Sequence, residues 1–184
     1  MKKILVMTMA MLAMAFAFTS CGDDDDDDIP GGGGSSAVTV RRVYIFDNGN
    51  EYLNRQYKLT IGSETKVLKL SELKKETAAP KSVETKAGSK LDEAKQKGTI
   101  DVYSYDIPAT MHGDAHFNSD FSIKDGVELP ETTDVLIAAF IGVGDEQYLS
   151  ASGNLFFMPG LMKEKVKDYI EQRNAATFGS CTVK

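Results

Sequence analysis

Three residues with metal-binding side chains stand close together in the pattern His112-x-Asp114-x-His116. Imidazole nitrogens bind zinc at about 2.0–2.1 Å, and carboxylates serve as further ligands. In a strand, alternate residues share a face roughly 7 Å apart, so the two histidines would lie too far apart for one ion, although Asp114 could act with either. If Gly113 and Asp114 form a turn instead, the histidines face each other across a hairpin. Capture of a divalent metal or small ligand is therefore one hypothesis, and a solvated polar face is the other.

No other group of residues has the spacing of a catalytic or metal-binding motif. Asp47, Asn48, Asn50 and Glu51 offer oxygen ligands, but the EF-hand spacing is absent, and Asn-Gly is typical of a tight turn. The sequence contains neither a G-x-S-x-G nucleophile elbow nor a P-loop. We therefore expect a protein that is not an enzyme and that needs no cofactor, unless a divalent metal binds at the His112 segment.

The N-terminus has the organisation of a secretory signal peptide over residues 1–20. Lys2 and Lys3 precede an apolar run from Ile4 to Phe18, which is followed by small residues. The run is too short for a transmembrane helix, which needs roughly 20 apolar residues. The chain is thus predicted to enter a secretory pathway.

The end of this segment, Phe18-Thr19-Ser20-Cys21, resembles the lipobox of bacterial lipoproteins. The resemblance implies that Cys21 is the first mature residue and carries a diacylglycerol and an acyl chain, which together give stable membrane anchoring. Cys181, the other cysteine, then has no partner for a disulfide within the chain. We expect it to be a packed and unreactive thiol.

Six consecutive aspartates follow the lipobox. Gly22 and the run Asp23, Asp24, Asp25, Asp26, Asp27 and Asp28 resemble the acidic segment behind the lipidated cysteine of many Bacteroidota lipoproteins. That resemblance implies export to the outer face of the outer membrane. In physical terms, like charges repel and extend the chain, and the glycines of residues 31–34 continue a flexible tether over residues 21–36.

The remaining residues, 37–184, have the length of one domain. The net charge of the whole chain is −6. Removing Lys2 and Lys3 changes the charge to −8, and leaving out the six aspartates brings it to −2. The acidity therefore belongs to the tether, and without a basic patch a nucleic acid is a poor partner.

Alternating apolar residues, together with a continuous apolar run at residues 135–143, predict about seven strands, mostly antiparallel. Residues 37–46 and 51–61 are expected to form a hairpin across the Asp47–Asn50 turn. Residues 135–143 and 147–157 are expected to form a second hairpin. Further strands are predicted at residues 65–70, 99–107 and 111–123, with a short edge strand in the C-terminal tail. The expected fold is mainly β with some α, a sandwich-like antiparallel domain.

Two segments are not predicted as strands. Residues 161–173 carry an apolar stripe at helical spacing and predict one amphipathic C-terminal helix. Residues 71–98 are rich in charge and poor in apolar side chains, so we expect a partly flexible insertion. Within it, residues 71–77 and 89–97 are predicted as short helical turns and residues 78–87 as an exposed loop.

The segments VRRVYIFDNGNEYLNRQ (Val40–Gln56) and LPETTDVLIAAF (Leu129–Phe140) resemble strands in the first domain of fimbrillin-type lipoproteins. Those proteins are pilus subunits of Bacteroidota. The resemblance implies adhesion or assembly with other envelope or pilus proteins through strand exchange. The single domain, the insertion and the terminal helix depart from that family's pattern.

Together these features predict a lipoprotein of the outer membrane, facing outward or, as the alternative, facing the periplasm. Its partners are the membrane, reached through the lipid, and other envelope proteins. Its role is expected to be binding, adhesion or structural support. Six strand tyrosines suit either a binding face or the margin of a core: Tyr44, Tyr52, Tyr57, Tyr103, Tyr105 and Tyr148.

Overall fold

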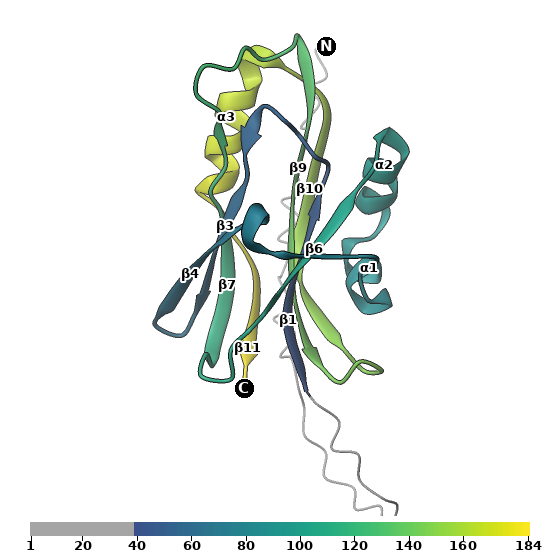
Figure 1. Ribbon diagram of the computed structural model, residues 1–184, viewed down its shortest axis with the longest axis vertical. Coiled ribbons are helices and arrows are strands. Elements are labelled where there is room, and N and C mark those ends of the chain that lie inside the picture. The colour runs from purple at the N-terminus through teal and green to yellow at the C-terminus, as the bar shows by residue number, and fades with distance from the viewer. Residues whose placement is uncertain (1–38) are drawn as a thin grey trace, which may run out of the picture.

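The computed structural model describes residues 39–184 (Figure 1). The predicted signal peptide, the lipidation site Cys21, the export run Asp23–Asp28 and the tether to residue 36 lie outside the described residues.

The described residues form two antiparallel sheets that face each other, with helices on one outer face and at one end (Figure 1). The first sheet has the order β10-β9-β1-β6-β5, with β1 at Val40–Asp47, β5 at Lys74–Glu76, β6 at Asp101–Asp106, β9 at Thr132–Gly144 and β10 at Ser150–Met162. The second has the order β11-β7-β3-β4, with β3 at Gln56–Ile61, β4 at Glu64–Lys69, β7 at Gly113–Ser119 and β11 at Thr177–Val183. A short pair joins β2 (Leu53–Asn54) to β8 (Ser122–Ile123). The predicted mainly β, sandwich-like fold is confirmed.

A first core fills the space between the two sheets. The inward side chains of β1 and β9, such as Val43 and Ile137, meet Leu59 and Phe117 from the second sheet. Cys181 of β11 is buried in the same cluster, so the packed position predicted for it is confirmed. Alternation along each strand therefore directs every second side chain into this core.

A second core lies on the opposite face of the five-stranded sheet. Helices α1 (Lys81–Ala87) and α2 (Ser89–Lys97) cover that face (Figure 1). Val83 and Leu91 pack there against the outward side chains of β1 and β9, including Phe46 and Phe140. Because both faces of β1 and β9 are covered, these strands are continuous apolar runs rather than alternating ones.

The expectation of an exposed loop at residues 78–87 is therefore wrong, because α1 forms there, whereas the helical turn predicted at residues 89–97 is confirmed as α2. The turn predicted at residues 71–77 is only partly present, since a 3-10 turn at Leu70–Glu72 is followed by β5. The insertion does carry an apolar stripe, made of Val83, Ala87, Leu91 and Ala94, which are all buried. Two of its members are alanines, whose small side chains leave the segment looking polar. Spacing of three and four residues, rather than overall hydrophobicity, marks its buried side.

The C-terminal helix is present as α3 (Lys163–Asn174). It begins two residues later than predicted because β10 continues to Met162. Val166 and Ile170 of α3 are buried against the core between the sheets. No helix of the described residues is long and apolar enough to span a membrane.

The two predicted hairpins have opposite outcomes. β9 and β10 pair directly across the loop at residues 145–149, as predicted. The hairpin predicted across Asp47–Asn50 is wrong, because β1 pairs with β6 and β9 whereas β3 pairs with β4 and β7. The Asn-Gly segment is a corner at which the chain leaves one sheet for the other.

The packing of α2 can be tested with Leu91→Ala, since Leu91 is buried between α2 and the sheet. We expect a loss of about 2–4 kcal/mol in the free energy of unfolding, measured in urea, as for other buried leucines. Gln96→Ala, on the exposed side of α2, is the matched control and should change stability by no more than about 0.5 kcal/mol. Equal stability of the two variants would mean that the helix does not pack on the sheet.

Candidate functional site

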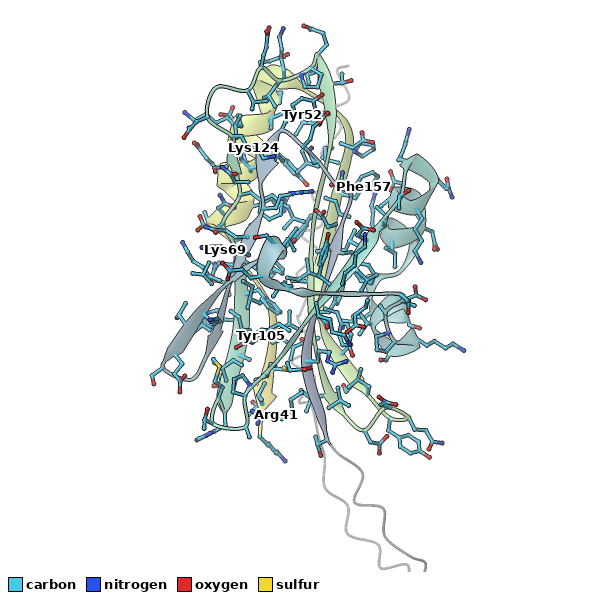
Figure 2. All side chains as sticks on the ribbon, in the orientation of Figure 1. Arg41, Tyr52, Lys69, Tyr105, Lys124 and Phe157 are labelled. Atoms are coloured by element: carbon cyan, nitrogen blue, oxygen red, sulfur yellow. The ribbon has the colours of Figure 1, made fainter. Side chains whose placement is uncertain are left out.

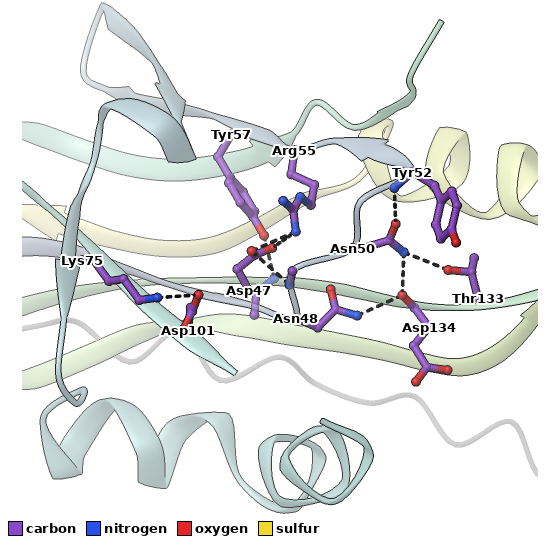
Figure 3. A network of polar contacts seen from close by, with 12 residues as sticks. Asp47, Asn48, Asn50, Tyr52, Arg55, Tyr57, Lys75, Asp101, Thr133 and Asp134 are labelled. Carbon is purple, nitrogen blue, oxygen red and sulfur yellow. Dashed lines mark hydrogen bonds and ion pairs between the residues drawn. The ribbon is translucent and has the colours of Figure 1, made fainter. Parts of the chain in front are cut away.

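The corner between the sheets is the most elaborate polar region of the described chain (Figure 3). Pairing of β1 with β9 ends at Ile45 opposite Ala139. Beyond that point β9 continues without its β1 neighbour, so its backbone groups need other partners. The first of them, the N–H of Ala138, donates to Oη of the fully buried Tyr57 at 2.8 Å.

Two asparagine side chains form hydrogen bonds with the backbone of the next part of β9. Nδ2 of Asn48 and Nδ2 of Asn50 both donate to the carbonyl oxygen of Asp134, at 2.9 and 2.8 Å. Asn50 also donates to Oγ1 of Thr133 and accepts from the N–H of Tyr52. The side-chain amides therefore replace a strand that has turned away (Figure 3). The other polar atom of the Asn48 side chain, Oδ1, is buried and has no hydrogen-bond partner among the described residues.

A buried ion pair holds the start of the corner. The carboxylate of Asp47, which is 3% exposed, accepts two hydrogen bonds from Nη1 of Arg55 at 2.7 and 2.8 Å. It also accepts the N–H of Gly49 at 3.1 Å. Burial raises the pKa of Asp47, and the Arg55 guanidinium offsets this only in part. The ion pair thus fixes the geometry of the turn, although the desolvation of Asp47 disfavours its charged form.

A cavity of about 290 Å³ opens where the corner meets α2. We call it the corner pocket. Residues 48–52 of the corner line it together with Ala94, Lys97 and Ile100. Asp134 and Phe157 complete it, and Tyr52 and Phe157 can be located in Figure 2. Its volume is at the lower end of the range for small-molecule sites.

The polar groups at the corner pocket differ in how firmly they are held. Oδ1 of Asp134 accepts the N–H of Gly160 at 2.6 Å, which positions the carboxylate. Lys97, at the last position of α2, and Glu51, in the turn, are exposed. The pocket therefore combines carboxylate acceptors, an ammonium donor and an apolar wall formed by Ile100 and Phe157. Such a lining can bind a small molecule but contains no nucleophile paired with a base.

The His112 segment does not form a metal site in the structure. β7 runs through Gly113 and Asp114, so the turn that would place the histidines across a hairpin is absent. Oδ1 of Asp114 accepts a hydrogen bond from Thr182 at 2.9 Å, and the backbone of His116 pairs with that of Thr60. Across residues 39–184, no three histidine, cysteine or acidic side chains gather closely enough to hold a metal ion.

A second cavity, of about 320 Å³, lies where the insertion begins. Its polar wall contains Arg42 and Glu76. Glu76 accepts the hydroxyl of Ser104 at 2.6 Å and pairs with Lys74 at 3.0 Å. Arg42 donates to Asp106 at 2.5 Å. Because these charged side chains already pair with one another or with neighbouring residues, fewer polar groups are available to a ligand here than in the corner pocket.

The tyrosines divide between the two predicted roles. Tyr44 and Tyr57 are buried, and Tyr103 and Tyr105 are half-buried against the core, so a shared tyrosine binding face is not formed. Only Tyr148 among the six is largely exposed, at 74%, in the loop between β9 and β10.

The chain matches no protein-family model, no curated protein and no solved structure. The site is therefore described by its own geometry. Sequence reasoning singled out Asp47, Asn48, Asn50 and Glu51 as a turn and did not anticipate their contact with Asp134, 84 residues away from Asn50 in the chain. Asparagines directly after the apolar end of β1 were the only local signal.

Breaking the Asp47–Arg55 pair should destabilise the fold. Asp47→Asn leaves the guanidinium of Arg55, whose side chain is 18% exposed, without its charge partner. We expect a loss of about 2–3 kcal/mol in urea unfolding, less than the ~3–5 kcal/mol of a fully buried pair. The double variant Asp47→Asn/Arg55→Met should be more stable than Asp47→Asn alone. A double variant that is less stable would show that the corner needs the guanidinium for packing.

Glu76 should make stability depend on pH. The hydrogen bond from Ser104, followed by the contacts with Lys74 and Arg42, lowers the pKa of Glu76 below its usual 4.5. An acid with a lowered pKa stabilises the folded state above its usual pKa, and the contribution disappears as the pH falls through the folded value. We therefore expect wild type to exceed Glu76→Gln in stability at pH 7 and the gap to close below about pH 4.5.

The control for this measurement is Glu164→Gln, an exposed glutamate in the first turn of α3. Its stability difference from wild type should be small and should show no comparable change over the same acid range. A gap at Glu76 that stays constant on acidification would contradict the lowered pKa.

Proposed function

We propose that this chain is a lipid-anchored envelope protein whose domain binds a small polar molecule at the corner pocket without catalysing a reaction. The N-terminal sequence supports the anchor, through the lipobox-like Phe18–Cys21 and the acidic run behind it. The observation that carries the binding role is the corner pocket itself. Its acceptors and donor surround an apolar wall on a scaffold fixed by buried hydrogen bonds.

A small hydroxylated molecule such as a saccharide fits this lining best. Its hydroxyls can donate to the carboxylates of Glu51 and Asp134 and accept from Lys97, while its carbon face rests on Phe157 or Ile100. Sites of this kind use a few placed polar groups for specificity and apolar surface for contact. The mixture of charges in the lining gives no preference for a strongly anionic ligand.

Assembly through strand exchange, the role implied by the fimbrillin-type resemblance, finds less support. At one side of the sandwich the edge strands β10 and β11 lie against each other, and Oγ of Ser152 donates to the carbonyl of Ser180 at 2.7 Å. At the other side, β4 is a short edge with exposed lysines, and β5 has three residues, two of them lysines. Short, lysine-bearing edges are typical of sheets that avoid adding a strand.

The binding role can be tested with the mature chain carrying Cys21→Ser, which remains soluble without lipid. A panel of neutral mono- and disaccharides, with free amino acids for comparison, is screened by the shift in melting temperature. We expect at least one saccharide to raise it and Lys97→Ala or Asp134→Asn to reduce that shift several-fold. Lys86→Ala, an exposed lysine on α1 outside the pocket, is the matched control. A shift that survives both pocket variants, or no shift from any compound, would overturn the proposed role of the pocket.

The anchor can be tested separately in cells. Wild type, Cys21→Ala and a deletion of Asp23–Asp28 are compared by membrane fractionation and by protease treatment of intact cells. We expect Cys21→Ala to leave the membrane fraction, and the deletion to become protected from protease while wild type is cut. Wild type cut only after lysis would place the domain in the periplasm.

A further inference from the structure

We propose that Asn48–Gly49 is a spontaneous modification site, which the folded corner holds unreactive and which converts irreversibly to aspartate or isoaspartate when the corner opens. This is the only Asn-Gly pair in the sequence. An asparagine followed by glycine is especially prone to cyclise, because glycine has no Cβ to obstruct its amide nitrogen. The proposal is independent of the ligand proposed for the corner pocket.

The reaction has two balanced steps. The backbone nitrogen of Gly49 attacks Cγ of Asn48, the N–Cγ bond forms, and the Cγ–Nδ2 bond breaks. Ammonia leaves with the proton that water removes from the Gly49 nitrogen, and a five-membered succinimide remains. Water then adds to one of the two ring carbonyls, and the bond between that carbon and the ring nitrogen breaks as the nitrogen takes a proton, which yields aspartate or isoaspartate. The isoaspartate product has one additional methylene in its main chain.

The folded corner opposes the first step at both reacting groups. The N–H of Gly49 donates to Oδ2 of Asp47, and Nδ2 of Asn48 donates to the carbonyl of Asp134. The nucleophile and the leaving group are therefore tied to different parts of the chain. The carboxylate of Asp47 is itself bound by Arg55 through both oxygens, which makes it a poor base for the Gly49 proton.

The intermediate of the first step is also disfavoured. Attack on Cγ places negative charge on Oδ1 of Asn48, and this atom is buried with no donor among the described residues. A buried charge without a partner is strongly destabilised. Space alone does not prevent the reaction, because Gly49 is exposed and nothing lies within 4 Å of where its Cβ would be. The hydrogen bonds, rather than crowding, hold the site unreactive.

Conversion should also weaken the closed corner. Either product replaces the Asn48 amide with a carboxylate, which cannot donate to the carbonyl of Asp134 at neutral pH. The new charge would lie in a corner that already contains the buried carboxylate of Asp47. Molecules that convert while the corner is open therefore lose stability permanently.

The test compares the mature chain in buffer and in urea at mildly alkaline pH, with the modified fraction at each asparagine read by peptide mass spectrometry as a gain of about one dalton. Asn118 and Asn174, which precede Ser119 and Ala175, are internal controls. In urea we expect Asn48 to convert well ahead of both controls and Gly49→Ala to slow the conversion several-fold. In buffer, Asn48 should remain unmodified over the same period.

Intermediate urea concentrations make the test independent of any variant, because the rate at Asn48 should rise with the fraction of open molecules. Asn50→Ala, which removes three hydrogen bonds from the corner, should accelerate conversion in buffer. Asn48→Asp should lower the melting temperature by several degrees. Equal rates in buffer and urea, no excess over Asn118 in urea, or an unchanged melting temperature of Asn48→Asp would overturn the corresponding part of the proposal.

Discussion

The change of sheet between Asp47 and Tyr52 is the constraint on which the rest of the structure depends. A strand that leaves its sheet abandons hydrogen-bonding groups on its neighbour, and buried groups of this kind must find other partners. Here the neighbour is β9, and its Ala138 N–H and Asp134 carbonyl are bound by Tyr57, Asn48 and Asn50. Each of these side chains comes from the segment that has turned away, so the corner and the second sheet are coupled.

The first sheet needs a core on each of its faces, because β1 and β9 are apolar on both sides and the second sheet can cover only one of them. The insertion between β5 and β6 supplies α1 and α2 for the other face. Because α2 ends beside the corner, its last turn becomes a wall of the corner pocket. A feature needed for packing thus also lines the corner pocket.

The corner also brings reactivity and protection to the same two residues. Glycine is needed at position 49 because φ is +67° there, and asparagine is needed at position 48 to serve β9. Together they make a labile dipeptide, and the hydrogen bonds that build the corner are the ones that restrain it. The rate at which Asn48 is modified therefore depends on how stable the corner is.

Several elements were predictable because their signal is local. Alternation located β3, β4 and β6, and a continuous apolar run located β9 of the β9–β10 hairpin. The stripe at residues 161–173 located α3. Pairing was less predictable. Asp47–Asn50 has turn chemistry, but a turn does not determine whether the next strand returns to the same sheet. In the insertion, α2 coincides with the helical turn predicted at residues 89–97. Helix α1 was missed because Ala87 adds little hydrophobicity although it is buried.

By itself, the sequence determined the strand positions, the apolar faces of β1 and β9, the turn at Asn48–Gly49 and the lipoprotein-like N-terminus as a hypothesis. These are properties of residues near one another in the chain. Tertiary structure alone decided that β1 and β3 lie in different sheets, that Asp134 meets Asn50, and that His112, Asp114 and His116 do not share a metal site. The physical reason is that these outcomes depend on which distant strand satisfies each backbone group, and that choice is made by the whole fold.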